Sequence, residues 1–223
     1  MQITEKVYTA LCVLFSSLIV FGNLTYQKIV IIEVFSLFQF QLSVGAILYP
    51  WTFLITDLIT EFYSKDKAMF CVRSAIATSF IVAILLAVMD ALPATSWSKL
   101  DDALFHKVFG GYVPCFISSV IACYTSQAID IRLYLLIRQI TGGKYLWLRN
   151  NCSTCISLFI DTSVIIVLLG AFGIVPFEQV PVLIYNSYSW KLFFTISSTP
   201  IFYVGVYAIR YMFNKRSEQQ TIS

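Results

Sequence analysis

Charged residues are scarce in this chain, and histidine is almost absent. Only 12% of the 223 residues are charged, and His106 is the single histidine. A soluble chain usually carries about 25% charged residues. Apolar residues take their place here: 58% of the chain is hydrophobic, and the mean hydropathy is +0.79. The sequence therefore predicts an integral membrane protein, with no stretch long enough to form a soluble domain.

The missing motifs narrow the function further. A lone histidine disfavours hydrolases that pair a nucleophile with histidine, and the sequence has neither an HExxH motif nor a GxxxxGK[ST] phosphate loop. Cys152 and Cys155 form a CxxC, but zinc or redox chemistry would need a second ligand pair or histidines. We therefore expect no enzymatic activity, no cofactor, no metal and no nucleic-acid partner, and interpret the cysteines as small buried apolar residues.

Long apolar runs predict how the chain crosses the membrane. A membrane-spanning helix needs about 20 mostly apolar residues. The fold class is therefore an all-α integral membrane protein, a single transmembrane domain over residues 1–223 with a bundle of six helices. The expected spans are about 7–25, 42–62, 68–92, 112–134, 151–173 and 191–213.

The distribution of basic residues orients the bundle. With an even number of spans, both termini lie on one side of the membrane. If that side is the cytoplasm, eleven Lys and Arg residues lie inside, and four lie outside, namely Lys28, Lys99, Lys107 and Lys191. This excess satisfies the positive-inside rule, so we place both termini in the cytoplasm.

Two local patterns interrupt the regular helical pattern. Phe38–Ser43 alternates apolar and polar residues, which is the period of a strand. We interpret 29–43 as an extended or hairpin-like segment that caps the outer end, with a frayed start of the second span as the alternative. Pro50 and Pro200 predict kinks or breaks in the second and sixth spans, and paired interruptions in a transporter can mark its substrate site.

Four acids lie where the sequence predicts lipid: Asp57, Glu61, Asp130 and Asp161. A carboxylate at the centre of the bilayer costs roughly 2.5–3.5 kcal/mol on insertion scales. Each acid is therefore expected to pair with an internal cation, bind a polar cargo or carry a proton. Asp57 and Glu61 are four residues apart and share one helix face.

The fifth predicted span carries a polar stripe. Asn150, Thr154, Ser157 and Asp161 follow one another at steps of four, three and four residues. Asp161 lies twelve residues beyond Arg149, about 18 Å along a helix and hence near the midplane. This face is expected to turn toward a polar interior.

The fourth span brings Gln127 and Asp130 to its inner end, where Arg149 and Glu61 are also expected. A structural ion-pair belt at this end, with long side chains reaching the headgroups, is the alternative to a binding site for Asp57, Glu61 and Asp130. Asp161 lies too deep for that alternative.

Two motifs are more specific than these patterns. The second span reads P-x-x-F-x-x-x-D-x-x-x-E-x-Y from Pro50 to Tyr63, and the fifth begins R-N-N-x-S-T from Arg149 to Thr154. Together they resemble the queuosine precursor transporters, the YhhQ-like branch of the vitamin uptake transporter group. The resemblance extends from about Asn23 to Tyr207.

The resemblance implies a six-helix bundle in the bacterial inner membrane, similar to the substrate-binding subunits of energy-coupling-factor transporters. It implies import of 7-cyano- or 7-aminomethyl-7-deazaguanine, or of queuine, for transfer-RNA queuosine salvage without an ATPase module. Protons are the candidate coupling ion, and the sequence defines no oligomeric state. The alternatives are a substrate-binding subunit that needs partner ATPases, and an intramembrane enzyme or scaffold.

Such a cargo matches the predicted polar interior. A deazaguanine presents a ring N–H and an NH₂ group that one carboxylate can accept together. We expect Asp161 or Asp57 to bind this edge. Glu61 or Asp130 is expected to bind the amine of an aminomethyl or queuine cargo, or to carry a proton.

The cargo also presents a carbonyl oxygen and a flat ring. Gln127, Asn150 or Arg149 can donate to the carbonyl. Trp51 or Tyr63 can stack on the ring, an interaction worth about 1–3 kcal/mol per base.

Overall fold

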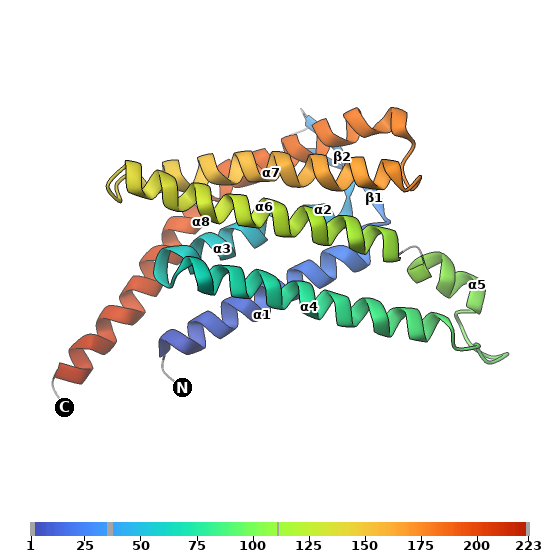
Figure 1. The fold of residues 1–223 in the computed structure, drawn as a ribbon, viewed down its shortest axis with the longest axis horizontal. Helices are drawn as coiled ribbons and strands as arrows, with labels where there is room; N and C mark the ends of the chain where they lie inside the picture. Colours follow the sequence, from blue (N-terminus) through green and yellow to red (C-terminus); the bar gives the residue numbers. More distant parts are fainter. Residues whose placement is uncertain (1–2, 35–37, 111, 222–223) are drawn as a thin grey trace.

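Long helices build most of the molecule (Figure 1). The structure is a computed structural model that describes residues 3–34, 38–110 and 112–221. In these residues, five helices are long and apolar enough to cross a membrane: α1 (Ile3–Thr25), α4 (Lys65–Asp90), α6 (Tyr112–Ile140), α7 (Leu146–Ala171) and α8 (Val180–Thr221). The prediction of a helical multi-pass membrane protein is confirmed. Short turns, α5 (Asp102–Phe105), η1 (His106–Gly110) and η2 (Phe177–Gln179), connect the helices.

The predicted span 42–62 is not one continuous helix. It divides into α2 (Val44–Ile47) and α3 (Pro50–Phe62). Pro50 occupies the first turn of α3, where its missing N–H leaves no helical hydrogen bond unmade. The 13 residues of α3 cover only about 20 Å of helix axis, less than the ~30 Å hydrocarbon core. The count of six spans therefore stays a prediction, with α2 and α3 as the broken candidate.

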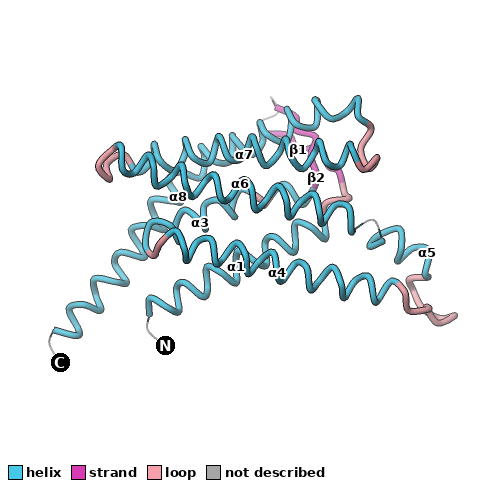
Figure 2. The backbone as a smooth tube through the Cα atoms, viewed as in Figure 1, coloured by secondary structure: helices cyan, strands magenta, loops and turns pink. Residues whose placement is uncertain are grey.

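A strand pair follows α1, as the alternating pattern predicted. β1 (Ile29–Val34) and β2 (Phe38–Ser43) are antiparallel, with Ile29 opposite Ser43; residues 35–37 lie outside the described residues. Figure 2 shows this hairpin in the half of the bundle that lies away from the termini, and we call this half the hairpin end. Phe40 contacts Trp190 of α8 edge to face, with ring centroids 5.7 Å apart.

The two termini lie together at the opposite end, which we call the termini end (Figure 1). The Tyr63 hydroxyl, just after α3, donates to the carbonyl of Thr4 at 2.7 Å. The ring of Phe213 near the end of α8 lies 5.7 Å from that of Phe62. The segment α2–α3 therefore leads the chain from the hairpin end back to the termini end.

Helix α8 differs from the predicted sixth span. It begins at Val180 instead of residue 191 and continues through Pro200 for 42 residues. Lys191 therefore lies inside a helix and is only 4% exposed. The sequence counted Lys191 among the outside residues, at the start of the sixth span. The structure buries it instead, because Asp161 of α7 lies 2.8 Å away and pairs with its charge.

Candidate functional site

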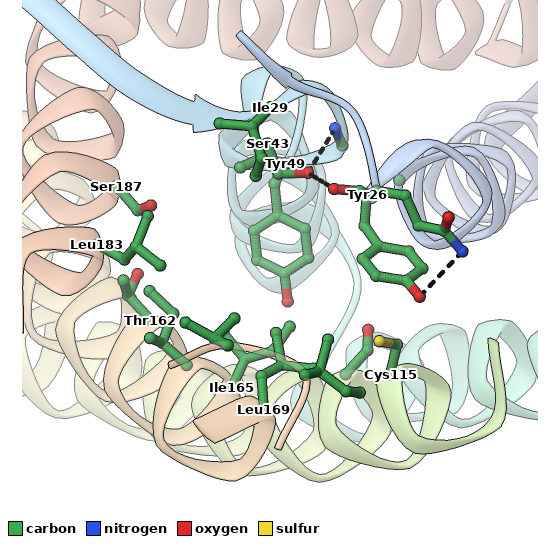
Figure 3. A pocket seen from close by; sticks show the side chains of 18 of the residues that line it. Tyr26, Ile29, Ser43, Tyr49, Cys115, Thr162, Ile165, Leu169, Leu183 and Ser187 are labelled. Carbon is green, nitrogen blue, oxygen red and sulfur yellow. Dashed lines mark hydrogen bonds between the residues drawn. The ribbon is translucent and has the colours of Figure 1, made fainter. Parts of the chain in front are cut away.

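A cavity of about 820 Å³ lies at the hairpin end of the bundle. Side chains from α1, the hairpin, α6, α7 and α8 line it, and Figure 3 shows Tyr49 and Tyr26 on one side with Ile165 and Leu169 on another. Most of the lining is apolar, with a few convergent polar groups. Both the volume and this composition are typical of small-molecule sites.

Three polar residues form the floor of the cavity: Tyr49, Asp161 and Lys191. Lys191 Nζ lies 2.8 Å from Asp161 Oδ2 and donates to Thr162 Oγ1 at 3.0 Å. The Tyr49 hydroxyl donates to Asp161 Oδ1 at 2.8 Å. Asp161 is 2% exposed, so its charge is balanced by an internal cation and hydrogen bonds.

Local sequence explains how the floor is assembled. Tyr49 stands at the break between α2 and α3, where the chain turns inward. Asp161 is the last residue of the polar stripe on α7, and Ser126 of α6 donates to its Oδ1 at 3.1 Å. Lys191 stands on α8, with its ammonium 4.7 Å from the centroid of the Tyr49 ring.

The prediction for Asp161 placed it deep in a polar interior, and the structure agrees. Lys191 and Tyr49 were missed. A signal for Lys191 exists: Ser187, Lys191, Thr195 and Ser198 follow at steps of four, four and three, and all four are buried. Such a stripe marks an inward helix face.

Glu61 and Arg149 lie apart from the cavity, at the termini end. Arg149 Nη2 is 2.7 Å from Glu61 Oε2. Arg210 Nη2 lies 3.3 Å from Oε1, and the Tyr134 hydroxyl donates to Oε2 at 3.1 Å. Arg138 lies at 3.7 Å. These residues form the Glu61 cluster, which ties α3, α6, α7 and α8 together and matches the predicted ion-pair alternative for Glu61.

Asp57 and Asp130 lie between the floor and the Glu61 cluster. Both are 0% exposed, and their carboxyl groups interact with each other. Thr154 Oγ1 donates to Asp57 Oδ2 at 3.4 Å. No ion pair in the described part of the chain includes either carboxylate. A structural ion-pair belt therefore describes Glu61 but not these two acids.

The remaining predicted residues do not line the cavity. Gln127 is buried and accepts a hydrogen bond from Thr56 Oγ1 at 2.8 Å, which joins α6 to α3. Asn150 is buried beside the Glu61 cluster residue Arg149. Trp51 packs on Phe194, with ring centroids 5.3 Å apart. The aromatic faces in the cavity belong to Tyr49 and Tyr26 instead (Figure 3).

The family model described as "Putative vitamin uptake transporter" matches residues 43–205. The chain belongs to this vitamin uptake transporter family. The matched residues include α3, α6 and α7. They also include the floor residues Tyr49, Asp161 and Lys191. With its apolar helices, this family member is a multi-pass protein of the bacterial inner membrane.

A Bacillus subtilis (strain 168) protein named "Probable queuosine precursor transporter" is similar to this vitamin uptake transporter family member. The two are 26% identical over 177 residues, which cover 78% of this chain and 76% of the relative. No solved structure matches. The resemblance that the two motifs indicated is confirmed.

Proposed function

We propose that this protein imports a queuosine precursor, a 7-deazaguanine base, across the bacterial inner membrane. The observation that carries the proposal is the paired Asp161 and Lys191 on the floor of the cavity at the hairpin end. The name of the Bacillus subtilis relative supports this class of cargo. With the termini in the cytoplasm, the cavity faces the outer side, where an importer collects its cargo.

The floor matches the edge of a guanine-like ring. That edge presents a carbonyl acceptor next to a ring N–H and an NH₂ group. The Lys191 ammonium has three N–H donors, two of which serve Asp161 and Thr162. The third can donate to the carbonyl. Asp161 already accepts from Tyr49, Ser126 and Lys191, and can accept one more charge-assisted hydrogen bond from the N–H or the NH₂ group.

The tyrosines suit the flat ring of the cargo. Tyr49 and Tyr26 present their rings to the cavity (Figure 3). Stacking a base on an aromatic side chain is worth about 1–3 kcal/mol. The apolar wall of α7 around Ile165 and Leu169 excludes water from the bound base.

Release requires a second step at the termini end. There the Glu61 cluster joins four helices. In our proposal this cluster closes the route to the cytoplasm. The proposed bundle has six spans and works without an ATPase. Protons drive its change between the outward-facing and the inward-facing state. The alternative is a substrate-binding subunit of an energy-coupling-factor-type transporter, which would be inactive in liposomes on its own.

Uptake tests the proposal. Cells that lack both their own importer and precursor synthesis receive the wild-type gene, and transfer-RNA queuosine is measured after 7-cyano- or 7-aminomethyl-7-deazaguanine is supplied. We expect queuosine to return with the wild type and with Asp66→Asn, an exposed control on α4, but not with Lys191→Met. If cells with the wild-type gene make no transfer-RNA queuosine, the proposal is wrong.

Binding to the purified protein separates the cargo classes. We expect 7-aminomethyl-7-deazaguanine to bind. Adenine, which lacks the carbonyl and the N–H donor of the six-membered ring, should bind at least tenfold more weakly. Transport by the purified chain in liposomes would exclude the subunit alternative, and co-purification of ATPase partners would favour it.

A further inference from the structure

Asp57 and Asp130 are buried carboxyl groups that no cation in the described residues holds in an ion pair. Both are 0% exposed, deep between three helices. Within the described residues, neither oxygen of Asp130 receives a well-formed hydrogen bond, nor does Oδ1 of Asp57. The hydroxyls of Ser153, Thr154 and Ser157 lie close to Asp130. Two buried carboxyl groups with so few donors are an unusual arrangement, since buried charges are normally paired.

The ionisable groups around the pair leave it short of positive charge. On α7 these groups are Arg149 and Cys155, on α6 Tyr134, and on α3 Glu61. Arg149 is already held by Glu61 at 2.7 Å. Arg138 and Arg210 also contact Glu61, and both are partly exposed to solvent.

Two adjacent carboxylates in a low-dielectric interior repel each other strongly. The usual outcome is that one proton is shared between them, as for paired carboxyls elsewhere. Arg149, which is already held by Glu61, cannot balance two negative charges on the pair. The pair is therefore built to bind and lose a single proton.

The pair is also connected to the cavity floor. On α6, Ser126 contacts Asp161, and its neighbour Gln127 accepts from Thr56, the residue before Asp57. On α7, Thr154 contacts Asp57, while Asp161 lies two turns along the same polar stripe. Two of the helices that line the cargo site, α6 and α7, thus also contact the pair, so a shift of either helix changes the surroundings of both.

We infer that Asp57 and Asp130 form a proton-binding site, separate from the cargo site, that couples import to inward proton movement. The inference rests on the proposed import function. One proton binds to the pair from the outer side together with the cargo. It leaves to the cytoplasm when the Glu61 cluster opens, and the empty carrier returns without it.

A proton fits this site better than a metal ion. Sodium and divalent ions need several oxygen ligands and the room to hold them. In the described part of the chain, no group of three or more His, Cys, Asp or Glu could hold a metal. Neither Asp57 nor Asp130 lines the cavity, whereas a proton needs no space.

Proteoliposomes test the coupling with radiolabelled 7-aminomethyl-7-deazaguanine as the probe. An inward proton gradient should make the wild type accumulate the probe several-fold above the outside concentration, and a protonophore should abolish this accumulation. Asn mimics a carboxyl that never releases its proton. Asp57→Asn and Asp130→Asn are made separately. Each should bind the probe with an affinity within about threefold of the wild type and should still exchange labelled for unlabelled probe across the membrane. Neither should accumulate the probe. Asp66→Asn should accumulate the probe like the wild type.

Proton uptake gives a second readout that needs no variant. Purified wild-type protein in weak buffer with a pH-sensitive dye should take up about one proton per bound probe molecule. If the probe binds without proton uptake, or if accumulation follows a sodium gradient at equal pH, the inference is overturned while the import function stands. Accumulation by both Asn variants would also overturn it. If the wild type does not bind the probe, the import function itself fails.

Discussion

Lys191 Nζ lies 2.8 Å from Asp161 Oδ2 and joins α8 to α7 across the floor of the cavity. Both side chains are at most 5% exposed. A buried pair of this kind adds little stability as a pair, but removal of one partner leaves an uncompensated charge, which costs about 3–5 kcal/mol. The pair is therefore sensitive to single substitutions and tolerant of a neutral double substitution.

The first prediction separates folding from binding at this pair. Asp161→Asn and Lys191→Met alone should lower the thermal midpoint of the detergent-purified protein by several degrees. The double substitution Asp161→Leu with Lys191→Met should restore most of that midpoint, because no charge is left unpaired. Binding of 7-aminomethyl-7-deazaguanine should be lost in all three. Equal stability of the single and double variants would show that the pair is not coupled.

The second prediction concerns Tyr49. Its hydroxyl donates to Asp161 Oδ1 at 2.8 Å, and its ring faces the cavity. Tyr49→Phe keeps the ring but removes this hydrogen bond, so affinity should fall about 2–10-fold, the equivalent of ~0.5–1.5 kcal/mol. Tyr49→Ala should cost more, since the ring is lost as well. Isothermal titration of the three proteins measures the difference; equal affinity for all three would place the base elsewhere.

The sequence was sufficient to predict the membrane class, the long helices and the burial of Asp161. Apolar runs and a polar stripe are local patterns of the sequence, and the helices that they predict are present in the folded structure. The hairpin was visible for the same reason, since strand alternation is local.

Three features depended on contacts between distant residues. Lys191 was placed at the outer start of the sixth span because nothing near it in sequence shows that Asp161 neutralises it. Pro50 predicted the break beside Tyr49, but the place of Tyr49 at the cavity also depends on tertiary packing, because Gly45 of α2 lies directly against Gly22 of α1. Arg149 was expected as a cargo donor, yet its charge is held by Glu61, 88 positions away in the chain.

The third prediction tests the Glu61 cluster. Glu61→Gln leaves the buried Arg149 without its carboxylate, and we expect a loss of about 3–5 kcal/mol in unfolding free energy. Arg138→Gln is the matched control, because Arg138 lies 3.7 Å from Glu61 and its side chain is 42% exposed. It should cost less than about 1 kcal/mol. Denaturant unfolding in mixed micelles measures both; similar losses would mean that Glu61 is not held mainly by Arg149.

The last prediction tests the close contact that sets the broken segment beside α1. A Cβ added to Gly45 would collide with the carbonyl of Gly22. Backbone atoms cannot move aside as a flexible side chain can, so Gly45→Ala should push α2 away from α1 and displace Tyr49, four residues on. Gly205→Ala is the control, since its Cβ would meet Leu58 Cδ1 at 3.4 Å, an ordinary contact. We expect Gly45→Ala to lower both the thermal midpoint and the affinity for 7-aminomethyl-7-deazaguanine, and Gly205→Ala to change neither by much. A Gly45→Ala protein with full affinity would show that the cavity floor does not depend on this contact.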